Sequence, residues 1–178
     1  MSRRKSGLGA LVAIDGVNGA AVTRAARDAA ARLARAERGG VSTWDASGIF
    51  GDLTVAGEDA GQASARTLLL LYAADLAFRL RWEIRPKLES GRSVVAAPYI
   101  ATAVSFGRAA GLDEAWLTNL FNFAPPPTES RAVTAAPARN GSRDGFVELA
   151  CETICERKGG PKRKDVLKRA RTFLRAHT

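Results

Sequence analysis

The stretch Leu11-Val12-Ala13-Ile14-Asp15-Gly16-Val17-Asn18-Gly19-Ala20-Ala21-Val22-Thr23 decides the fold of this 178-residue chain. An apolar run of strand character enters a turn that contains glycine, and an Ala- and Arg-rich helical segment follows at once. This is the setting of the pattern G-x-x-x-x-G-K-S/T, in which backbone N–H groups and a helix N-terminus surround a phosphate. Gly16 and Thr23 match the pattern, whereas Ala21 replaces the second glycine and Val22 replaces the lysine. The sequence therefore keeps the scaffold of a phosphate loop and loses its charge.

The composition is that of a globular protein with an excess of positive charge. Hydrophobic residues make up 46% of the chain and charged residues 25%, which is ordinary for one domain with a substantial core. The 27 basic and 18 acidic residues give a formal charge of +9, and the pI is 10.4. Such a balance favours anionic partners (a nucleotide, a nucleic acid or an acidic protein), although solubility alone explains it equally well.

Apolar runs and cysteines indicate a cytoplasmic protein without a membrane segment. The longest strongly apolar run, 68–74, is far shorter than the roughly 20 residues of a membrane span. The basic N-terminus precedes an apolar stretch that contains Asp15 and lacks a clear cleavage site, which argues against a signal peptide. Cys151 and Cys155 are the only cysteines of the chain, and His177 is its only histidine, so the residues that usually hold a metal are too few. We therefore expect buried or idle thiols rather than a metal site.

Strand and helix patterns alternate along the chain. We expect a buried strand over 8–15, followed by strands over 41–45, 93–97 and 131–136. Helical patterns cover 23–38 (closed by Gly39-Gly40), 63–89 (broken near Pro86), 101–109, 113–123 (capped by Asp113), 145–157 and 165–176, while 49–61 reads as a loop. This alternation predicts an α/β fold in which helices cover both faces of a parallel sheet.

Two further stretches carry a resemblance to a known family. Leu69-Leu70-Leu71-Tyr72-Ala73-Ala74-Asp75 is followed by Ile84-Arg85-Pro86-Lys87-Leu88-Glu89-Ser90-Gly91-Arg92-Ser93-Val94-Val95. In order, spacing and residue type they resemble the L-L-F-A-A-D-R and I-R-P-x-L-x-x-G segments of the thymidylate kinase family of P-loop nucleoside monophosphate kinases. The resemblance covers 8–124 well and 125–178 weakly. It implies one domain over 1–178, built as a three-layer sandwich around a parallel sheet.

On this resemblance, the departures fall on residues that handle phosphate. Val22 stands where the family has its phosphate-loop lysine, and Asn18 stands where an acidic residue is common. Leu76 corresponds to the arginine that grips the monophosphate, and Ala97-Pro98-Tyr99 corresponds to a D-R-Y strand end. Thr23 keeps the hydroxyl that would hold Mg²⁺. The resemblance thus implies a loop remnant formed by Gly16, Asn18, Gly19, Val22 and Thr23.

The resemblance also implies a remnant of a nucleoside pocket. Tyr72 corresponds to the aromatic residue that stacks on thymine, and Tyr99 survives from the D-R-Y strand end. Asp45, preceded by Trp44, corresponds to the acidic residue of an R-E-P segment. The arginine-bearing lid of the family is short here, with Arg139 and Arg143 as its candidate substitutes.

Each retained residue also has a structural interpretation. Gly16 and Gly19 suit any tight strand-to-helix turn, and the Thr23 hydroxyl suits a helix cap. Tyr72 lies on an apolar helix face and suits the core, while Asp15 and Asp45 suit the capping of adjacent turns.

The leading hypothesis is a thymidylate-kinase-like protein that lost catalysis and acts as a binding or regulatory homodimer through 63–89. Its expected partner is a protein or a weakly held nucleotide. Losing one preorganised charge costs about 3–4 kcal/mol of transition-state stabilisation, and several such charges are missing together. No residue is therefore assigned to catalysis or to a metal. One alternative is an active kinase of ATP and dTMP with a rearranged site, which alone would require ATP and Mg²⁺. Another is a basic protein that binds nucleic acid nonspecifically through cations at 157, 158, 162–164, 168, 169, 171 and 175.

Overall fold

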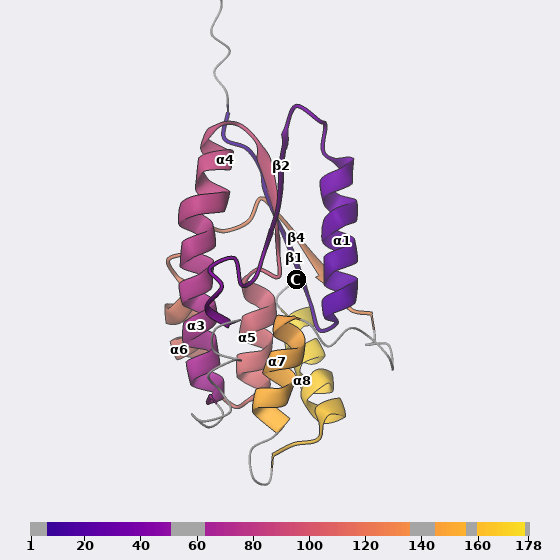
Figure 1. Ribbon diagram of the computed structural model, residues 1–178. Helices are drawn as coiled ribbons and strands as arrows, with labels where there is room; N and C mark the ends of the chain where they lie inside the picture. The colour runs from indigo at the N-terminus through magenta and orange to yellow at the C-terminus, as the bar shows by residue number, and fades with distance from the viewer. Residues whose placement is uncertain (1–6, 51–62, 136–144, 156–159, 177–178) are drawn as a thin grey trace, which may run out of the picture.

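A parallel sheet forms the centre of the molecule (Figure 1). The computed structural model describes residues 7–50, 63–135, 145–155 and 160–176. In this part of the chain four strands, β1 (Leu11–Gly16), β2 (Arg38–Thr43), β3 (Ser93–Ala97) and β4 (Glu129–Val133), lie in the order β2-β3-β1-β4. The helices are α1 (Gly19–Arg32), α3 (Ala65–Arg79), α4 (Arg85–Glu89), α5 (Ile100–Ala109), α6 (Glu114–Phe121), α7 (Phe146–Cys155) and α8 (Arg163–Arg175).

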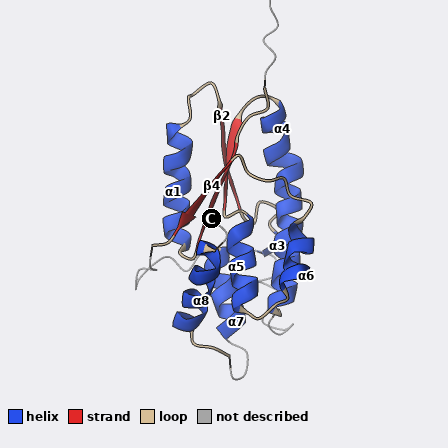
Figure 2. Cartoon of the chain, turned by 180° about the vertical axis from the view of Figure 1, so that it is seen from behind, coloured by secondary structure: helices blue, strands red, loops and turns tan. Residues whose placement is uncertain are grey.

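Two apolar clusters separate the sheet from the helices on its two faces. Strand β1 pairs in parallel with β3 (Val12 opposite Val95) and with β4 (Val12 opposite Glu129). Alternate side chains of β1 and β3 point to opposite faces, so both strands are buried on both sides. One face packs against α1, and the other packs against the larger group of helices that includes α3, α5 and α7 (Figures 1 and 2). The predicted α/β architecture with a covered parallel sheet is confirmed.

The first helix begins and ends earlier than its sequence pattern predicts. We expected it over 23–38, and it runs from Gly19 to Arg32. It begins early because the Asn18 side chain caps the run of small residues that follows. It ends early because Leu33 is extended, and the Arg38 guanidinium binds the carbonyls of Ala31 and Leu33.

The glycine pair that was expected to close this helix lies in β2 instead. Strand β2 covers Arg38–Thr43 rather than 41–45, and its pairing with β3 shifts between Arg38 and Gly40. A Cβ atom on Gly39 would lie 2.8 Å from the Ser93 carbonyl oxygen, and Gly40 has a φ of +99°. Close approach of two strands and a local bulge therefore explain these glycines.

The long helical segment over 63–89 continues past its proline through a change of helix type. Helix α3 ends at Arg79, a π-helical turn covers Leu80–Ile84, and α4 follows with Pro86 near its start. Because Pro86 has no N–H, it cannot bond the carbonyl four residues earlier. The Arg85 N–H instead bonds the Leu80 carbonyl, five residues back.

The remaining elements lie close to their expected positions. Strand β3 covers the expected residues, β4 starts two residues before 131, and Asp113 caps α6 as predicted by accepting a bond from the Trp116 N–H (2.8 Å). Helices α5, α7 and α8 differ from the expected ranges by at most two residues at either end. The expected loop over 49–61 lies mostly outside the described residues.

Candidate functional site

The turn between β1 and α1 is shorter than a phosphate loop. Strand β1 ends at Gly16 and α1 begins at Gly19, so two residues connect them. The Oδ1 atom of Asn18 accepts a hydrogen bond from the Ala21 N–H (3.1 Å), and its backbone carbonyl accepts one from the Val22 N–H (2.9 Å). The Ala21 N–H belongs to the first helical turn, where an anion would bind, whereas the Val22 bond is the first hydrogen bond within the helix. The Asn18 side chain therefore occupies one donor that a phosphate could use.

Val22 faces the core, in the position that the family's lysine would use to reach a phosphate. Its side chain is 3% exposed and packs among apolar residues of β1, β3 and α1: Val12, Ile14, Ala26, Ala29, Ala30, Val95 and Ala97. A Cβ atom on Gly16 would lie 2.6 Å from the Val22 Cγ2 atom and 2.8 Å from the Val133 carbonyl oxygen. Gly16 is thus needed for close packing of the turn against Val22 and β4.

Thr23 does not cap helix α1. It lies in the second turn of α1 and is exposed. The capping role considered for Thr23 belongs to Asn18. The structure thus assigns the cap to another residue, and the role of Thr23 as a magnesium ligand stays a prediction.

Asp15 supplies a buried hydrogen-bond acceptor to the N-terminus of α5. Its Oδ1 atom accepts bonds from the Tyr99 N–H (3.0 Å), the Thr102 N–H (2.9 Å) and the Thr102 hydroxyl (2.8 Å). Burial raises the pKa of the Asp15 carboxyl above its ordinary value, and the hydrogen bonds from Thr102 and Tyr99 oppose that rise. The Thr102 hydroxyl also accepts a bond from the Gly16 N–H (2.9 Å). A carboxyl group of β1 therefore accepts hydrogen bonds from the backbone N–H groups at the start of α5.

Arg79, which the sequence pattern did not indicate as a functional residue, connects the ends of β2 and β3 through side-chain hydrogen bonds. It is fully buried, and its guanidinium donates to the Ser42 hydroxyl (3.0 Å), the Ser42 carbonyl (2.8 Å) and the Pro98 carbonyl (3.1 Å). The Pro98 carbonyl and the Tyr99 N–H belong to one peptide group. That peptide therefore lies between the Arg79 cation and the Asp15 carboxyl and bridges them. Leu76, one turn earlier, is itself fully buried, so no cation projects from that position.

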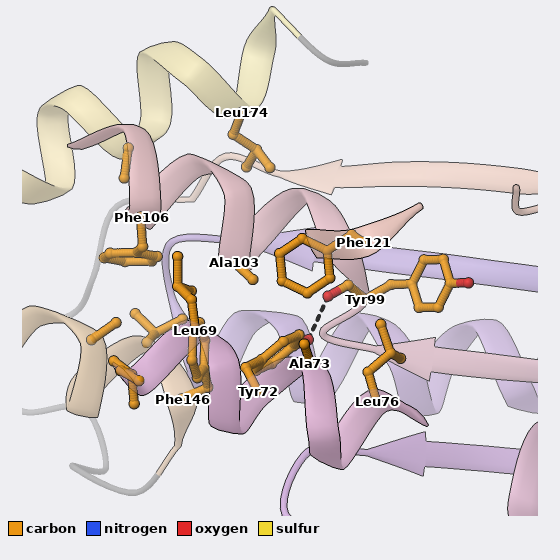
Figure 3. Close-up of a cluster of buried hydrophobic side chains, with 14 of the residues drawn as sticks. Leu69, Tyr72, Ala73, Leu76, Tyr99, Ala103, Phe106, Phe121, Phe146 and Leu174 are labelled. Carbon is orange, nitrogen blue, oxygen red and sulfur yellow. Dashed lines mark hydrogen bonds between the residues drawn. The ribbon is translucent and has the colours of Figure 1, made fainter. Parts of the chain in front are cut away.

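Tyr72 is a core residue whose ring is covered by other aromatic side chains (Figure 3). Its ring centroid lies 4.4 Å from that of Phe146 on α7 and 6.1 Å from that of Phe121 on α6. Its hydroxyl donates to the Pro98 carbonyl (3.0 Å) and to the Tyr99 carbonyl. Burial raises the pKa of the Tyr72 hydroxyl. The expectation of a core residue fits this environment, and a ring packed in this way offers no stacking surface to a base.

Tyr99 is likewise directed into the protein. Its hydroxyl donates to the Pro125 carbonyl (2.8 Å), and burial raises the pKa of that hydroxyl to about 12. The residue is 1% exposed and stands immediately before α5. Tyr99 therefore joins β3, α5 and the proline segment after α6.

Asp45 organises the loop after β2 rather than a ligand site. Its backbone has a φ of 58°, and its Oδ1 atom accepts a bond from the Phe50 N–H (2.9 Å). Buried Asp75 accepts bonds from the Asp45 N–H (3.0 Å) and from the N–H and hydroxyl of Ser47. The structural interpretation of Asp45, which caps its own turn, is the one that this geometry supports.

The other expectations concern metals, thiols and the lid. Among the described residues, no cluster of histidine, cysteine and carboxylate side chains has the arrangement of a metal site. Cys151 and Cys155 are free thiols, and burial raises the pKa of Cys151 to about 12. Arg139 and Arg143 lie outside the described residues. In the described part of the chain, no helix combines the length and apolar character that crossing a membrane requires.

Comparison with known proteins connects this geometry to a family. No protein-family model matches the chain. The probable thymidylate kinase of Thermococcus gammatolerans is 38% identical over 69 residues, which are 39% of this chain and 33% of that protein. The probable thymidylate kinase of Thermococcus kodakarensis is 36% identical over 69 residues, 39% of this chain and 34% of that protein. The crystal structure of thymidylate kinase from Ehrlichia chaffeensis superimposes with a TM-score of 0.69, over 95% of this chain and 86% of that one, at 12% identity.

The chain is similar in sequence to thymidylate kinases over 69 residues and shares the fold of one of them. The sequence match spans about a third of the length of the curated relatives, and the structural match extends the shared fold over nearly the whole chain. The family resemblance expected from the sequence is thereby confirmed.

The groups on which a thymidylate kinase depends, ATP and Mg²⁺, do not fit the residues of this turn. The Ala21 N–H at the start of α1 is already bonded to the Asn18 side chain, and the side chain in the lysine position is neutral and buried. The hydroxyl of Thr23 lies on an exposed face of the helix. No step of phosphoryl transfer is therefore derived for this chain.

Proposed function

We propose that this protein is a thymidylate-kinase-like pseudoenzyme that binds no nucleotide phosphate at the β1–α1 turn and acts as a homodimer with a binding or regulatory role. The observation that carries the proposal is the closed turn, in which Asn18 caps α1 and Val22 is buried. Phosphoryl transfer depends almost entirely on positioning and on charge stabilisation. A short turn that is capped by its own asparagine and carries no cation in the lysine position supplies little of either.

The filled nucleoside side supports the same proposal. Phe146 covers the ring of Tyr72, and the hydroxyl groups of Tyr72 and Tyr99 are bonded to backbone carbonyls. Binding a base here would require displacement of a buried aromatic side chain, which commonly costs several kcal/mol. We therefore expect neither half of a nucleotide to find a preformed site.

The exposed face of α3 supports the homodimer. Leu70, Ala74 and Phe78 of α3 follow one another at intervals of four residues, and Trp82 of the π-helical turn comes four residues later. All four are exposed, with exposed fractions of 50% for Leu70 and 64% for Trp82. In an antiparallel pair of α3 helices with its two-fold axis at Ala74, Leu70 of one copy lies opposite Phe78 of the other. This row of residues is self-complementary and suits an isologous interface.

The location follows from the thiols. Cys151 and Cys155 lie on one helix and are not joined in a disulfide bond. Free thiols on a helix suit a reducing compartment, so we propose that the protein works in the cytoplasm.

Calorimetric titration with ATP, ADP, dTMP and thymidine tests the proposal, because it measures binding apart from catalysis. We expect no saturable heat for any of the four ligands, with any affinity weaker than about 1 mM. A coupled assay with ATP, dTMP and Mg²⁺ should show no turnover above the rate without protein. Saturable binding of ATP or dTMP, or robust turnover, would support the active-kinase alternative and contradict the pseudoenzyme.

A further inference from the structure

Helix α8 carries a large share of the positive charge of the chain. Within Arg163–Arg175 six residues are basic and one, Asp165, is acidic, whereas the formal charge of all 178 residues is +9. More than half of the net charge is therefore concentrated on 13 residues. This uneven distribution is not explained by solubility, which a dispersed charge would serve as well.

The apolar side of α8 is fully used by the fold. Val166, Leu167, Ala170 and Leu174 are buried, and the helix packs against α5 and α7 at the periphery of the molecule (Figure 2). An amphipathic helix inserts into a lipid surface through its apolar face. Because that face is occupied, the basic side of α8 is the side that remains for a partner.

The structure divides the cations of α8 into engaged and available ones. Arg163 is paired with Glu148 of α7, and Arg171 is half-buried. Lys164, Lys168 and Arg169 are exposed, and within the described residues none of the three forms an ion pair. These three side chains therefore keep their full charge toward solvent.

A hollow on the same side of α8 contains two of these cations. Its volume is about 320 Å³, and it is lined by Asp165, Lys168, Arg169, Thr172 and Phe173. The Thr172 hydroxyl bonds the Lys168 carbonyl (3.1 Å), and the ring of Phe173 lies against Arg108 (4.5 Å from its guanidinium carbon). The hollow thus combines an ammonium and a guanidinium group with one carboxylate, and its aromatic ring is already in contact with another residue.

We propose that the outer side of α8 binds the phosphate backbone of a nucleic acid, with Lys164, Lys168 and Arg169 as its anion contacts. Helix α8 is about 20 Å long, and Lys164 and Lys168 are separated by about 6 Å along it. A duplex carries one negative charge per about 1.7 Å of its axis, so several phosphates lie within reach of this row. No exposed aromatic ring accompanies the described cations of α8, so the binding is independent of base sequence.

This proposal is independent of the proposed pseudoenzyme role, because it uses neither the β1–α1 turn nor the α3 face. Fluorescence anisotropy with a labelled 20-base-pair DNA duplex, from 50 to 300 mM NaCl, tests it with two variants of equal net charge. The first variant is Lys168→Glu/Arg169→Glu. The second is Arg24→Glu/Arg27→Glu, which reverses two exposed arginines on α1. Thermal melts establish that both variants are folded.

We expect the α8 variant to bind at least about 10-fold more weakly than the wild type and to lose about two from the slope of log K against log salt concentration. The α1 variant should stay within about 3-fold of the wild type, because it removes the same charge from another surface. Equal losses in the two variants would show a general charge effect and overturn the proposal. Absence of binding at 50 mM NaCl would overturn it as well, as would displacement of the duplex by poly-glutamate at equal charge concentration, which would indicate an acidic protein partner.

Discussion

At the scale of single residues, Val22 has a structural role at the position where the thymidylate kinase pattern has a lysine. In the family pattern this position carries a cation directed at phosphate, whereas here the side chain belongs to the cluster between α1 and the sheet. The neighbouring Gly16 is packed so closely against Val22 that even a methyl group would collide with it. The change at this position is therefore coupled to the packing around it.

This coupling predicts that restoring the lysine fails to restore function. Val22→Lys places an ammonium group in an apolar cluster without a partner, so we expect a loss of about 3 kcal/mol or more in the free energy of unfolding and no kinase turnover. Urea denaturation and the coupled assay measure the two effects. Thr23→Lys is the matched control, because the adjacent residue is exposed and its change should cost less than about 0.5 kcal/mol. A folded Val22→Lys protein that phosphorylates dTMP would contradict this account.

At the scale of secondary structure, α3 performs two tasks on its two sides. Its inner side carries Tyr72, Asp75 and Arg79, which hold the loop after β2 and the end of β3. Its outer side carries Leu70, Ala74 and Phe78, and the exposed row continues to Trp82 in the π-helical turn. A contiguous apolar row of this kind on a surface helix is typical of a protein interface.

The exposed apolar residues of α3 predict a dimer that a single charged substitution disrupts. The wild type should sediment at twice its mass of 18.9 kDa, whereas Leu70→Glu and Phe78→Glu should sediment as monomers, because each places two carboxylates in an isologous interface. Ala31→Glu, at an exposed position of α1, serves as control and should remain dimeric. Analytical ultracentrifugation distinguishes the species. A monomeric wild type, or a dimer that persists in both α3 variants, would exclude this interface.

At the scale of the whole molecule, buried polar groups connect elements that are far apart in the sequence. Asp15 on β1 and Arg79 on α3 meet at the peptide between Pro98 and Tyr99, and Asp75 holds the loop that follows β2. These groups lie at the carboxyl ends of the strands, where open α/β sheets generally bind ligands. In this protein, side chains of the chain itself bond the backbone groups at this edge of the sheet, where the family resemblance leads us to expect phosphate binding.

Asp15 makes the global stability depend on pH in a defined direction. Because the pKa of Asp15 is raised in the folded state, the folded protein binds more protons than the unfolded chain between the ordinary value of 3.8 and the raised one. Its contribution to the free energy of unfolding therefore grows as pH falls through the raised pKa and is lost as pH rises.

Comparison with Asp15→Asn isolates this contribution. The amide oxygen of asparagine can still accept the bonds from Tyr99 and Thr102, but the side chain does not titrate. We expect the stability of the wild type relative to this variant to increase by up to about 1.4 kcal/mol per pH unit as pH is lowered through that window. Urea unfolding at a series of pH values measures it. Parallel profiles for the two proteins would contradict a raised pKa.

The sequence by itself determined the parallel α/β fold, the relation to the thymidylate kinases, and the loss of charge at Val22, Leu76 and 97–98. These properties are recorded in local periodicity, in the spacing of motifs and in residue type, all of which act over short stretches of chain. Only the tertiary structure decided which contacts surround the residues at these positions. The cap at Asn18 moved the start of α1, Phe146 covered Tyr72 from 74 positions away in the chain, and Arg79 reached Pro98 across the strand ends. Packing between such distant segments depends on shape and on hydrogen-bond partners that no local pattern specifies, so the short turn that joins β1 to α1 and the packing of Val22 against it are seen only in the folded chain.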